Sequence, residues 1–212
     1  ELAPQARFAA YLPAVGALTA LTGSVMALRQ ERLQRLLAYS SVSNAGLLII
    51  GVGAWAAAGR STDGVRAILF FLGVYAFMSN GTFAFLKYSR LETRTQLKGR
   101  GFSMPAAAAA FTILLFSLGG IPPTGGFLAK LLLLWRAVDA QLPWPAAAGA
   151  LSALISLSYY LGMTRELWFE APQGPGPKPG EGAPLVIACA VGVLLLGAAP
   201  WLMSSLPGAP AK

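Results

Sequence analysis

A single lysine in a long apolar stretch constrains this chain more than any other feature. Residues 104–138 are almost entirely apolar, and the stretch is interrupted once, by GGIPPTGG at 119–126. Lys130 follows that interruption. A lysine at the centre of a bilayer costs about 2.5–3.5 kcal/mol on insertion scales, and such residues mark functional sites by default. We therefore expect Lys130 to belong to a functional site.

The composition places the chain in a membrane. Apolar residues make up 56% of it and charged residues 11%, whereas soluble domains are about 25% charged. With no histidine and one cysteine, the sequence argues against a metal site, haem, disulfide or Cys-His nucleophile, and we expect no cofactor in this chain. Cys189 reads as a packing residue. The net charge of +8 fits basic cytoplasmic loops better than nucleic-acid binding.

Apolar runs of about 20 residues predict an all-α integral membrane protein with about six transmembrane helices, one of them discontinuous. We expect one transmembrane domain over residues 1–212. The predicted spans are 8–28, 36–58, 68–85, 105–138, 146–167 and 185–206.

The fourth run is too long for one straight span and too short for two. Its roughly 34 residues would extend about 51 Å, against a hydrocarbon core of about 30 Å. We therefore predict one span broken at 119–126. Proline lacks an amide donor, glycine permits unusual dihedral angles, and non-helical backbone at this depth survives only inside protein or beside water. The residues of the predicted break are Gly119, Gly120, Pro122, Pro123, Gly125 and Gly126.

Six alternating spans divide the basic residues unequally between the two sides of the membrane. One side, expected to be cytoplasmic, carries Arg29, Arg32, Arg35, Lys87, Arg90, Arg94, Lys98, Arg100, Arg165 and Lys178. The other carries Arg7, Arg60, Arg66, Arg136 and Lys212.

Two interpretations of Lys130 follow from its depth. It could be a snorkelling lysine whose amine reaches the headgroups, although it lies far from both ends of its span. It could instead be a titratable proton carrier, because burial and a helix N-terminus near Thr124 both disfavour the charged amine. Water beside the broken helix would then conduct the protons.

Polar residues in two other spans are candidates for a hydrated proton path or, alternatively, for helix packing. In the second span they begin at its cytoplasmic mouth, and Tyr39 and Ser43 share one helix face. The candidates are Arg35, Tyr39, Ser40, Ser43, Asn44, Ser79 and Asn80. Tyr159 and Tyr160 fit helix packing or an interfacial belt.

Two segments resemble one known family. Residues 35–46 read RLLAYSSVSNAG and residues 117–130 read SLGGIPPTGGFLAK. Both resemble the antiporter-like membrane subunits of respiratory complex I, the NADH:quinone oxidoreductase, and the whole chain looks most like subunit N. Because members have about fourteen spans, the chain resembles the C-terminal part of a longer protein.

The resemblance implies a non-redox subunit of a proton-pumping enzyme in a bacterial or archaeal cytoplasmic membrane. Lys130 matches the charged residue of the family's second broken helix, which is thought to carry protons. Quinone, FMN and iron–sulfur clusters would belong to partner subunits, and this chain would contact neighbouring antiporter-like and small membrane subunits. Many relatives have histidine where this chain has Asn44, so a relay there would need water.

Two alternatives stay open. A subunit of a multisubunit cation/proton antiporter or of a membrane-bound hydrogenase would share both motifs. A structural membrane subunit that has lost transport would agree with the missing histidines, and it predicts a dry cavity around Lys130 without a polar neighbour.

Overall fold

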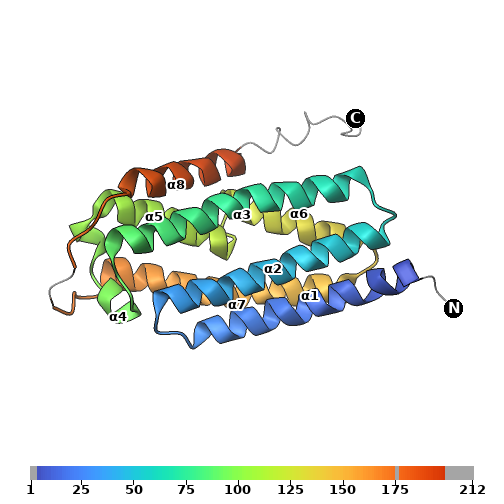
Figure 1. Cartoon of the computed structure of the whole chain (residues 1–212), viewed down its shortest axis with the longest axis horizontal. Coiled ribbons are helices and arrows are strands. Elements are labelled where there is room, and N and C mark those ends of the chain that lie inside the picture. The colour runs from blue at the N-terminus through green and yellow to red at the C-terminus, as the bar shows by residue number, and fades with distance from the viewer. Residues whose placement is uncertain (1–3, 175–176, 199–212) are drawn as a thin grey trace.

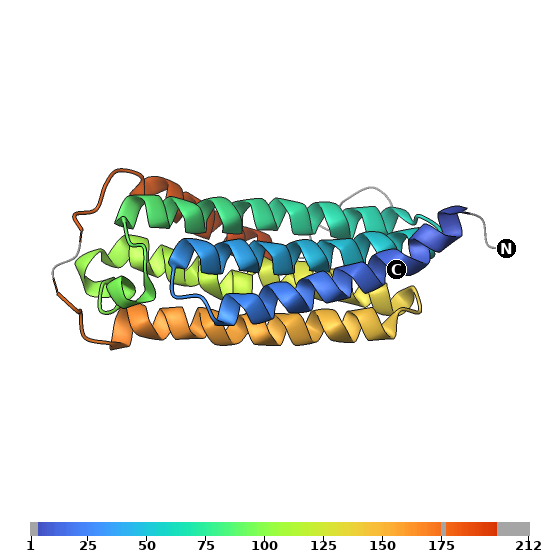
Figure 2. The same cartoon turned by 60° about the horizontal axis from the view of Figure 1, so that its bottom comes forward.

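The chain folds into an elongated, all-helical bundle whose long helices run along a common axis (Figures 1 and 2). The structure is a computed structural model that describes residues 4–174 and 177–198, with side chains from residue 11 onward. Within those residues, the only strand-like pairing is an isolated bridge between Arg32 and Thr93. The predicted all-helical membrane class is confirmed, since four helices are long and apolar enough to cross a membrane.

The helices follow the predicted spans, with shifted ends. Their bounds are α1 (Pro4–Leu28), α2 (Leu33–Ala57), α3 (Thr62–Ser89), α4 (Arg94–Leu97), α5 (Pro105–Gly119), α6 (Gly125–Asp139), α7 (Pro143–Phe169) and α8 (Ala183–Ala198). Helix α3 extends beyond the predicted 68–85 at both ends, because the Ser61 side chain caps its start and Arg90 ends it in a left-handed conformation. Residues 199–206 of the sixth predicted span lie outside the described residues.

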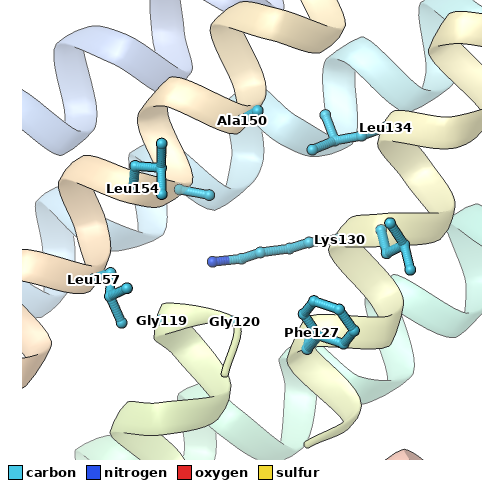
Figure 3. A pocket seen from close by; sticks show the side chains of 10 residues that line it. Gly119, Gly120, Phe127, Lys130, Leu134, Ala150, Leu154 and Leu157 are labelled. Carbon is cyan, nitrogen blue, oxygen red and sulfur yellow. The ribbon is translucent and has the colours of Figure 1, made fainter. Parts of the chain in front are cut away.

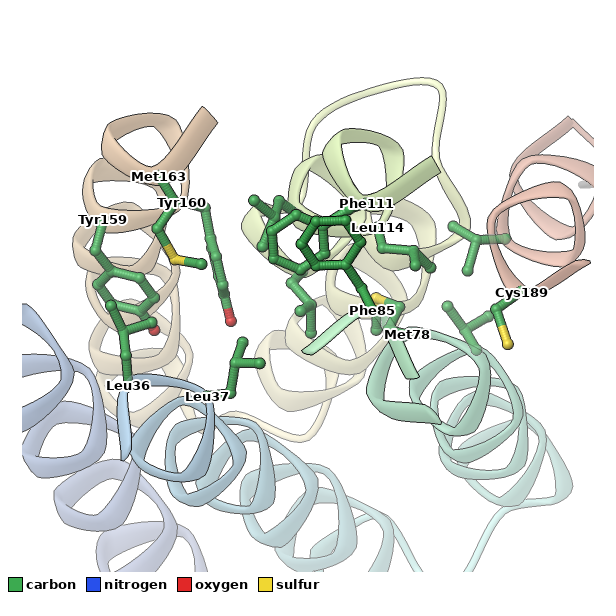
Figure 4. Packing of buried hydrophobic residues seen from close by; sticks show 14 of the residues in the cluster. Leu36, Leu37, Met78, Phe85, Phe111, Leu114, Tyr159, Tyr160, Met163 and Cys189 are labelled. Atoms are coloured by element: carbon green, nitrogen blue, oxygen red, sulfur yellow. The ribbon is translucent and has the colours of Figure 1, made fainter. Parts of the chain in front are cut away.

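Helices α5 and α6 occupy the middle of the bundle. Both contact α3, α7 and α8, and α6 also contacts α2. Their apolar side chains fill the core, where the rings of Phe85 and Phe111 stack with centroids 3.9 Å apart (Figure 4). The two half-helices are therefore packed against other helices, whereas Pro122 and Pro123 of the break between them are exposed in the described bundle.

Glycines bring α1 and α2 into close contact. A β-carbon at Gly46 would collide with the backbone of Ala20, and one at Gly23 would lie 2.5 Å from the Ser43 amide nitrogen. Small residues at such positions let two membrane helices pack backbone to backbone. This close pairing fixes the face that α2 turns toward α7.

The two ends of the bundle carry the two predicted sets of basic residues. The loops after α1, α3 and α7 lie at one end, and those joining α2 to α3 and α6 to α7 lie at the other (Figure 1). At the first end, the Arg94 guanidinium donates two hydrogen bonds to the Glu166 carboxylate, at 2.5 and 3.0 Å, and Lys98 forms an ion pair with Glu170 at 3.0 Å. Lys212 and the side chain of Arg7 lie outside the described residues.

Candidate functional site

The break begins where α5 ends in a left-handed glycine. Gly120 has φ +79°, and its amide donates to the Ser117 carbonyl at 3.0 Å while the Ile121 amide donates to the Phe116 carbonyl at 2.9 Å. This pattern is a Schellman motif, which satisfies two of the last free carbonyls of a helix. The Leu118 carbonyl lies in the same final turn.

Helix α6 begins alongside the end of α5. Thr124 is its N-cap residue, and the amide of Gly126 donates to the Ser117 hydroxyl at 3.0 Å. A β-carbon at Gly126 would collide with the Ser117 carbonyl. Within the predicted break, only residues 120–124 are non-helical. The break is therefore narrower than the predicted 119–126, because Gly119 belongs to the last turn of α5 and Gly125 and Gly126 to the first turn of α6.

Lys130 is the buried cation of this site. Its side chain is only 5% exposed, and Nζ donates to the Leu118 carbonyl at the C-terminal end of α5. A lysine in a helix leans toward the helix N-terminus, which here directs the amine back across the break. The negative end of the α5 dipole stabilises an ammonium there. The sequence suggested only the opposing influence of the α6 N-terminus.

The amine lies in an apolar pocket between α6 and α7 (Figure 3). The pocket has a volume of about 280 Å³. Its lining consists of Gly119, Gly120, Phe127, Lys130, Leu131, Leu134, Ala150, Ala153, Leu154 and Leu157. Leu154 is 65% exposed and Leu131 45%, so the pocket reaches the outside of the described bundle. Lys130 is the only charged or hydroxyl-bearing side chain in this lining.

A second polar region lies between α2 and α7, and we call it the α2–α7 seam. Its members are Ser40, Ser43, Asn44, Ser152, Ser156, Tyr159 and Tyr160, all of them buried. The hydroxyls of Ser40 and Tyr160 are hydrogen-bonded, and those of Ser43 and Ser152 lie 2.8 Å apart. Ser152 also donates to the Ala20 carbonyl of α1 at 3.0 Å. The hydrogen bonds of the seam therefore connect α1, α2 and α7.

Two polar atoms in the seam lack a protein partner. They are Oδ1 of Asn44 and the hydroxyl of Tyr159, on side chains that are 4% and 2% exposed. The Asn44 amide nitrogen donates to the Ser40 carbonyl at 3.0 Å. One acceptor and one donor therefore remain unsatisfied inside the bundle, where most buried polar groups are paired.

Helix α7 separates the seam from the Lys130 pocket. Ala150, Ala153, Leu154 and Leu157 line the pocket. The α7 members of the seam, Ser152, Ser156, Tyr159 and Tyr160, point toward α2 instead. The two regions approach each other at Gly119, where an added β-carbon would lie 3.0 Å from Leu157 and 3.7 Å from the ring of Tyr160.

The structure gathers some of the predicted path residues and separates others. Ser40, Ser43 and Asn44 meet in the seam. Arg35 and Asn80 are exposed, and the Asn80 amide bonds its own helix at the Ala76 carbonyl. Tyr39 and Ser79 are half-buried. Within the described residues, no hydrogen bond or ion pair joins Arg35, Tyr39, Ser79 or Asn80 to Lys130, so their role in a proton path stays a prediction.

Comparison with known proteins identifies the family. The family described as the NADH:quinone oxidoreductase/Mrp antiporter transmembrane family matches residues 4–156. The chain belongs to this family. NADH-quinone oxidoreductase subunit N 1 of Rhizobium meliloti (strain 1021) is 37% identical over 160 residues, which are 73% of this chain and 32% of the relative. Subunit N of Salinibacter ruber (strain DSM 13855 / M31) is 35% identical over 202 residues, covering 87% and 40%.

Two solved structures share the fold. A chain of respiratory complex I from Thermus thermophilus with bound aureothin superposes with a TM-score of 0.80 at 28% identity, over 92% of this chain and 44% of that one. A chain of the Mrp complex from Dietzia sp. DQ12-45-1b gives 0.81 at 23% identity, covering 93% and 45%. The chain thus spans less than half the length of these relatives.

Sequence reasoning missed the α7 half of the seam in this antiporter-family chain. No motif in the sequence marks Ser152 or Ser156, and the sequence favours packing or an interfacial belt for Tyr159 and Tyr160. The signal was present, because residues 152, 156 and 160 follow at steps of four and therefore share a helix face. What the sequence lacked was the register that sets Tyr160 opposite Ser40.

Proposed function

We propose that this chain is part of an antiporter-like subunit that translocates protons in a NADH:quinone oxidoreductase, with Lys130 as the proton carrier. The observation that supports the proposal most strongly is the burial of the Lys130 side chain. Among the described side chains from residue 11 onward, Lys130 is the only buried lysine, arginine, aspartate or glutamate. An ionisable group this deep is expensive, and such groups in membranes commonly serve in proton relays.

In this proposal the chain is a multi-pass protein of a bacterial or archaeal cytoplasmic membrane. Helices α1, α2, α3, α7 and α8 each form one span, and α5 and α6 are the two halves of a sixth. The chain itself holds no redox group. Quinone, FMN and iron–sulfur clusters belong to partner subunits, and neighbouring antiporter-like and small membrane subunits contact this one. The names of the relatives at 35–37% identity support this assignment.

The proposed carrier works by exchanging one proton. As an ammonium, Lys130 donates to the Leu118 carbonyl and is stabilised by the C-terminal end of α5. As a neutral amine, it fits the apolar lining of its pocket. Because each state is favoured by a different part of the site, a modest change in the surrounding field can shift the balance between them.

The α2–α7 seam is the proposed hydrated branch of the path. Water bound at the unpaired Asn44 Oδ1 and at the Tyr159 hydroxyl would satisfy an acceptor and a donor. Such water would supply the proton transfer that Asn44 itself cannot perform. The Ser40–Tyr160 pair then brings the branch to Gly119, beside the turn that holds the amine.

The test uses the complete assembly reconstituted in vesicles. Lys130→Ala should leave NADH oxidation by the peripheral subunits intact and lower the number of protons moved per NADH. Leu131→Ala, in the next residue of the same pocket lining, is the matched control and should pump normally. Normal pumping by Lys130→Ala in a correctly assembled complex would rule out the proposed carrier.

A second candidate is a subunit of a multisubunit cation/proton antiporter or a membrane-bound hydrogenase. The family description covers Mrp antiporters, and the Mrp chain has the same fold. The functions differ in driving force, because an antiporter would exchange protons for another cation without NADH. A purely structural subunit is the third possibility. The apolar lining around Lys130 agrees with it, whereas the hydrogen bond from Nζ to the Leu118 carbonyl does not. Unchanged proton transport in Lys130→Ala would support it.

A further inference from the structure

Four residues of α2 form one stripe on the outside of the bundle. Arg35, Ala38, Tyr39 and Val42 follow the spacing i, i+3, i+4 and i+7, which places them on one helix face. With Gln30 they line a shallow pocket of about 400 Å³. Arg35, Ala38 and Val42 are exposed and Tyr39 is half-buried, so the stripe faces away from the Lys130 site.

The stripe changes in chemistry along the helix. It begins with a guanidinium in the first turn of α2, passes a small residue and a phenol, and ends at Val42, which is 43% exposed. Seven residues of helix cover about 10 Å. A charged head, an intermediate hydroxyl and an apolar end over that distance match the order of groups in a phospholipid.

The positive charge at this pocket is not paired with an acidic side chain in the described part of the chain. Arg29, Arg32 and Arg35 are all exposed, and none of them forms an ion pair within residues 11–174 and 177–198. At the same end of the bundle, Arg94 and Lys98 are paired with glutamates. Lys87 and Arg90 at the end of α3 form no ion pair within the described residues either, but the α1–α2 joint gathers three such arginines within seven residues.

Backbone hydrogen bonds hold this joint in place. The Leu33 amide donates to the Glu92 carbonyl at 2.8 Å, and the Arg94 amide donates to the Glu31 carbonyl at 3.0 Å. The Gln30 side chain folds back onto the Met26 carbonyl at 3.1 Å. A ligand that meets a fixed joint loses less conformational entropy in binding than one that must order a loose loop.

We propose that the pocket formed by Gln30, Arg35, Ala38, Tyr39 and Val42 binds one anionic phospholipid. Its phosphate pairs with the Arg35 guanidinium, with Arg29 and Arg32 adding to the positive field, and an acyl chain lies along Val42. Basic pockets at the cytoplasmic ends of membrane helices attract acidic headgroups in this way, and guanidinium binds phosphate with paired hydrogen bonds. An acidic segment of a partner protein is the alternative occupant that the test separates.

The experiment measures phosphatidylglycerol retained by the purified complete assembly, by native mass spectrometry after exchange into phosphatidylcholine nanodiscs with graded phosphatidylglycerol. Arg35→Gln is expected to weaken retention of one lipid about fivefold, as one surface arginine contributes roughly 1 kcal/mol. Lys87→Gln, which removes an exposed charge at the end of α3, should leave that lipid in place.

A steric pair separates a shaped pocket from general charge attraction. Ala38→Phe fills the pocket and keeps every arginine, so the lipid should be lost. Ala106→Phe adds the same ring at an exposed position in the first turn of α5, and the lipid should remain. Retention in Ala38→Phe, or equal loss in Arg35→Gln and Lys87→Gln, would overturn the proposal. Unchanged retention with crosslinking of position 35 to a partner subunit would overturn it in favour of a protein contact.

Discussion

The two sides of helix α7 differ in polarity. One side carries Ser152, Ser156, Tyr159 and Tyr160 and meets hydroxyl and amide groups of α2. The other side offers only alanines and leucines to Lys130. Polar groups on the first side are dispersed and mostly paired with each other, whereas the second side surrounds a single ionisable amine.

The contrast indicates which side is built for stability and which for a change of charge. Hydroxyls that bond across helices fasten α7 to α1 and α2, and they gain or lose no proton near neutral pH. An amine with apolar neighbours and one backbone acceptor can exist in either charge state. Substitutions on the two sides of α7 should therefore change different properties of the protein.

The largest effect is expected for Ser152→Val. It removes the bonds to Ser43 and to the Ala20 carbonyl and adds a branched side chain at a fully buried position, which should cost about 2–4 kcal/mol. Ala150→Val makes a similar change on the exposed pocket side of α7 and should cost less than about 0.5 kcal/mol. Heat-induced dissociation of the purified assembly measures both, and equal losses would contradict the division between the two sides.

On the pocket side, replacing Lys130 should raise the stability of the protein instead of lowering it. Lys130→Met shortens the side chain by one atom and removes the buried amine, so the protein should become more stable by as much as about 2–3 kcal/mol. Proton transport should fall at the same time. A variant that loses both stability and transport would show that Lys130 mainly holds the break together through the Leu118 carbonyl.

A smaller loss is expected for Tyr160→Phe. The ring still packs, but Ser40 loses its partner hydroxyl, and a hydrogen bond between membrane helices contributes roughly 0.6 kcal/mol and at most about 1.7. Ser158→Ala, at an exposed position of α7, is the control. Thermal dissociation gives the stability difference. If the seam also conducts protons, Tyr160→Phe should slow transport, while Ser158→Ala should not.

The smallest effect lies at the end of α7, outside the apolar region. The Lys98 ammonium hydrogen-bonds Glu170 and holds the pKa of that carboxyl below its usual value. A depressed pKa in the folded state adds stability above the unfolded pKa of about 4.3, and that contribution disappears as the pH falls through the folded value. Glu170→Gln should therefore lower the melting temperature slightly at pH 7 and not at pH 3. A difference that persists at pH 3 would exclude the ion pair as its cause.

The sequence predicted the parts of this molecule that depend on local chemistry. Glycine and proline located the break, and apolar run lengths located the helices near their observed bounds. Which way a side chain faces was harder to predict. Asn80 and Arg35 are polar, as residues of a proton path would be, yet the rotation of their helices places both on the outside of the bundle. Ser152 finds its partner Ser43 only because α7 packs against α2. Rotation depends on contacts between distant segments, which one sequence does not display.

The hydrogen bond from the Gly126 amide to the Ser117 hydroxyl has a mechanical consequence. It sets the start of α6 beside the last turns of α5, and α8 lies against the same joint, since a β-carbon at Gly197 would meet the Pro123 carbonyl. The two half-helices are thereby held together as one offset unit. In a thinner or thicker bilayer this unit resists bending at the break, so the bundle would respond by tilting as a whole or by deforming the lipid around it.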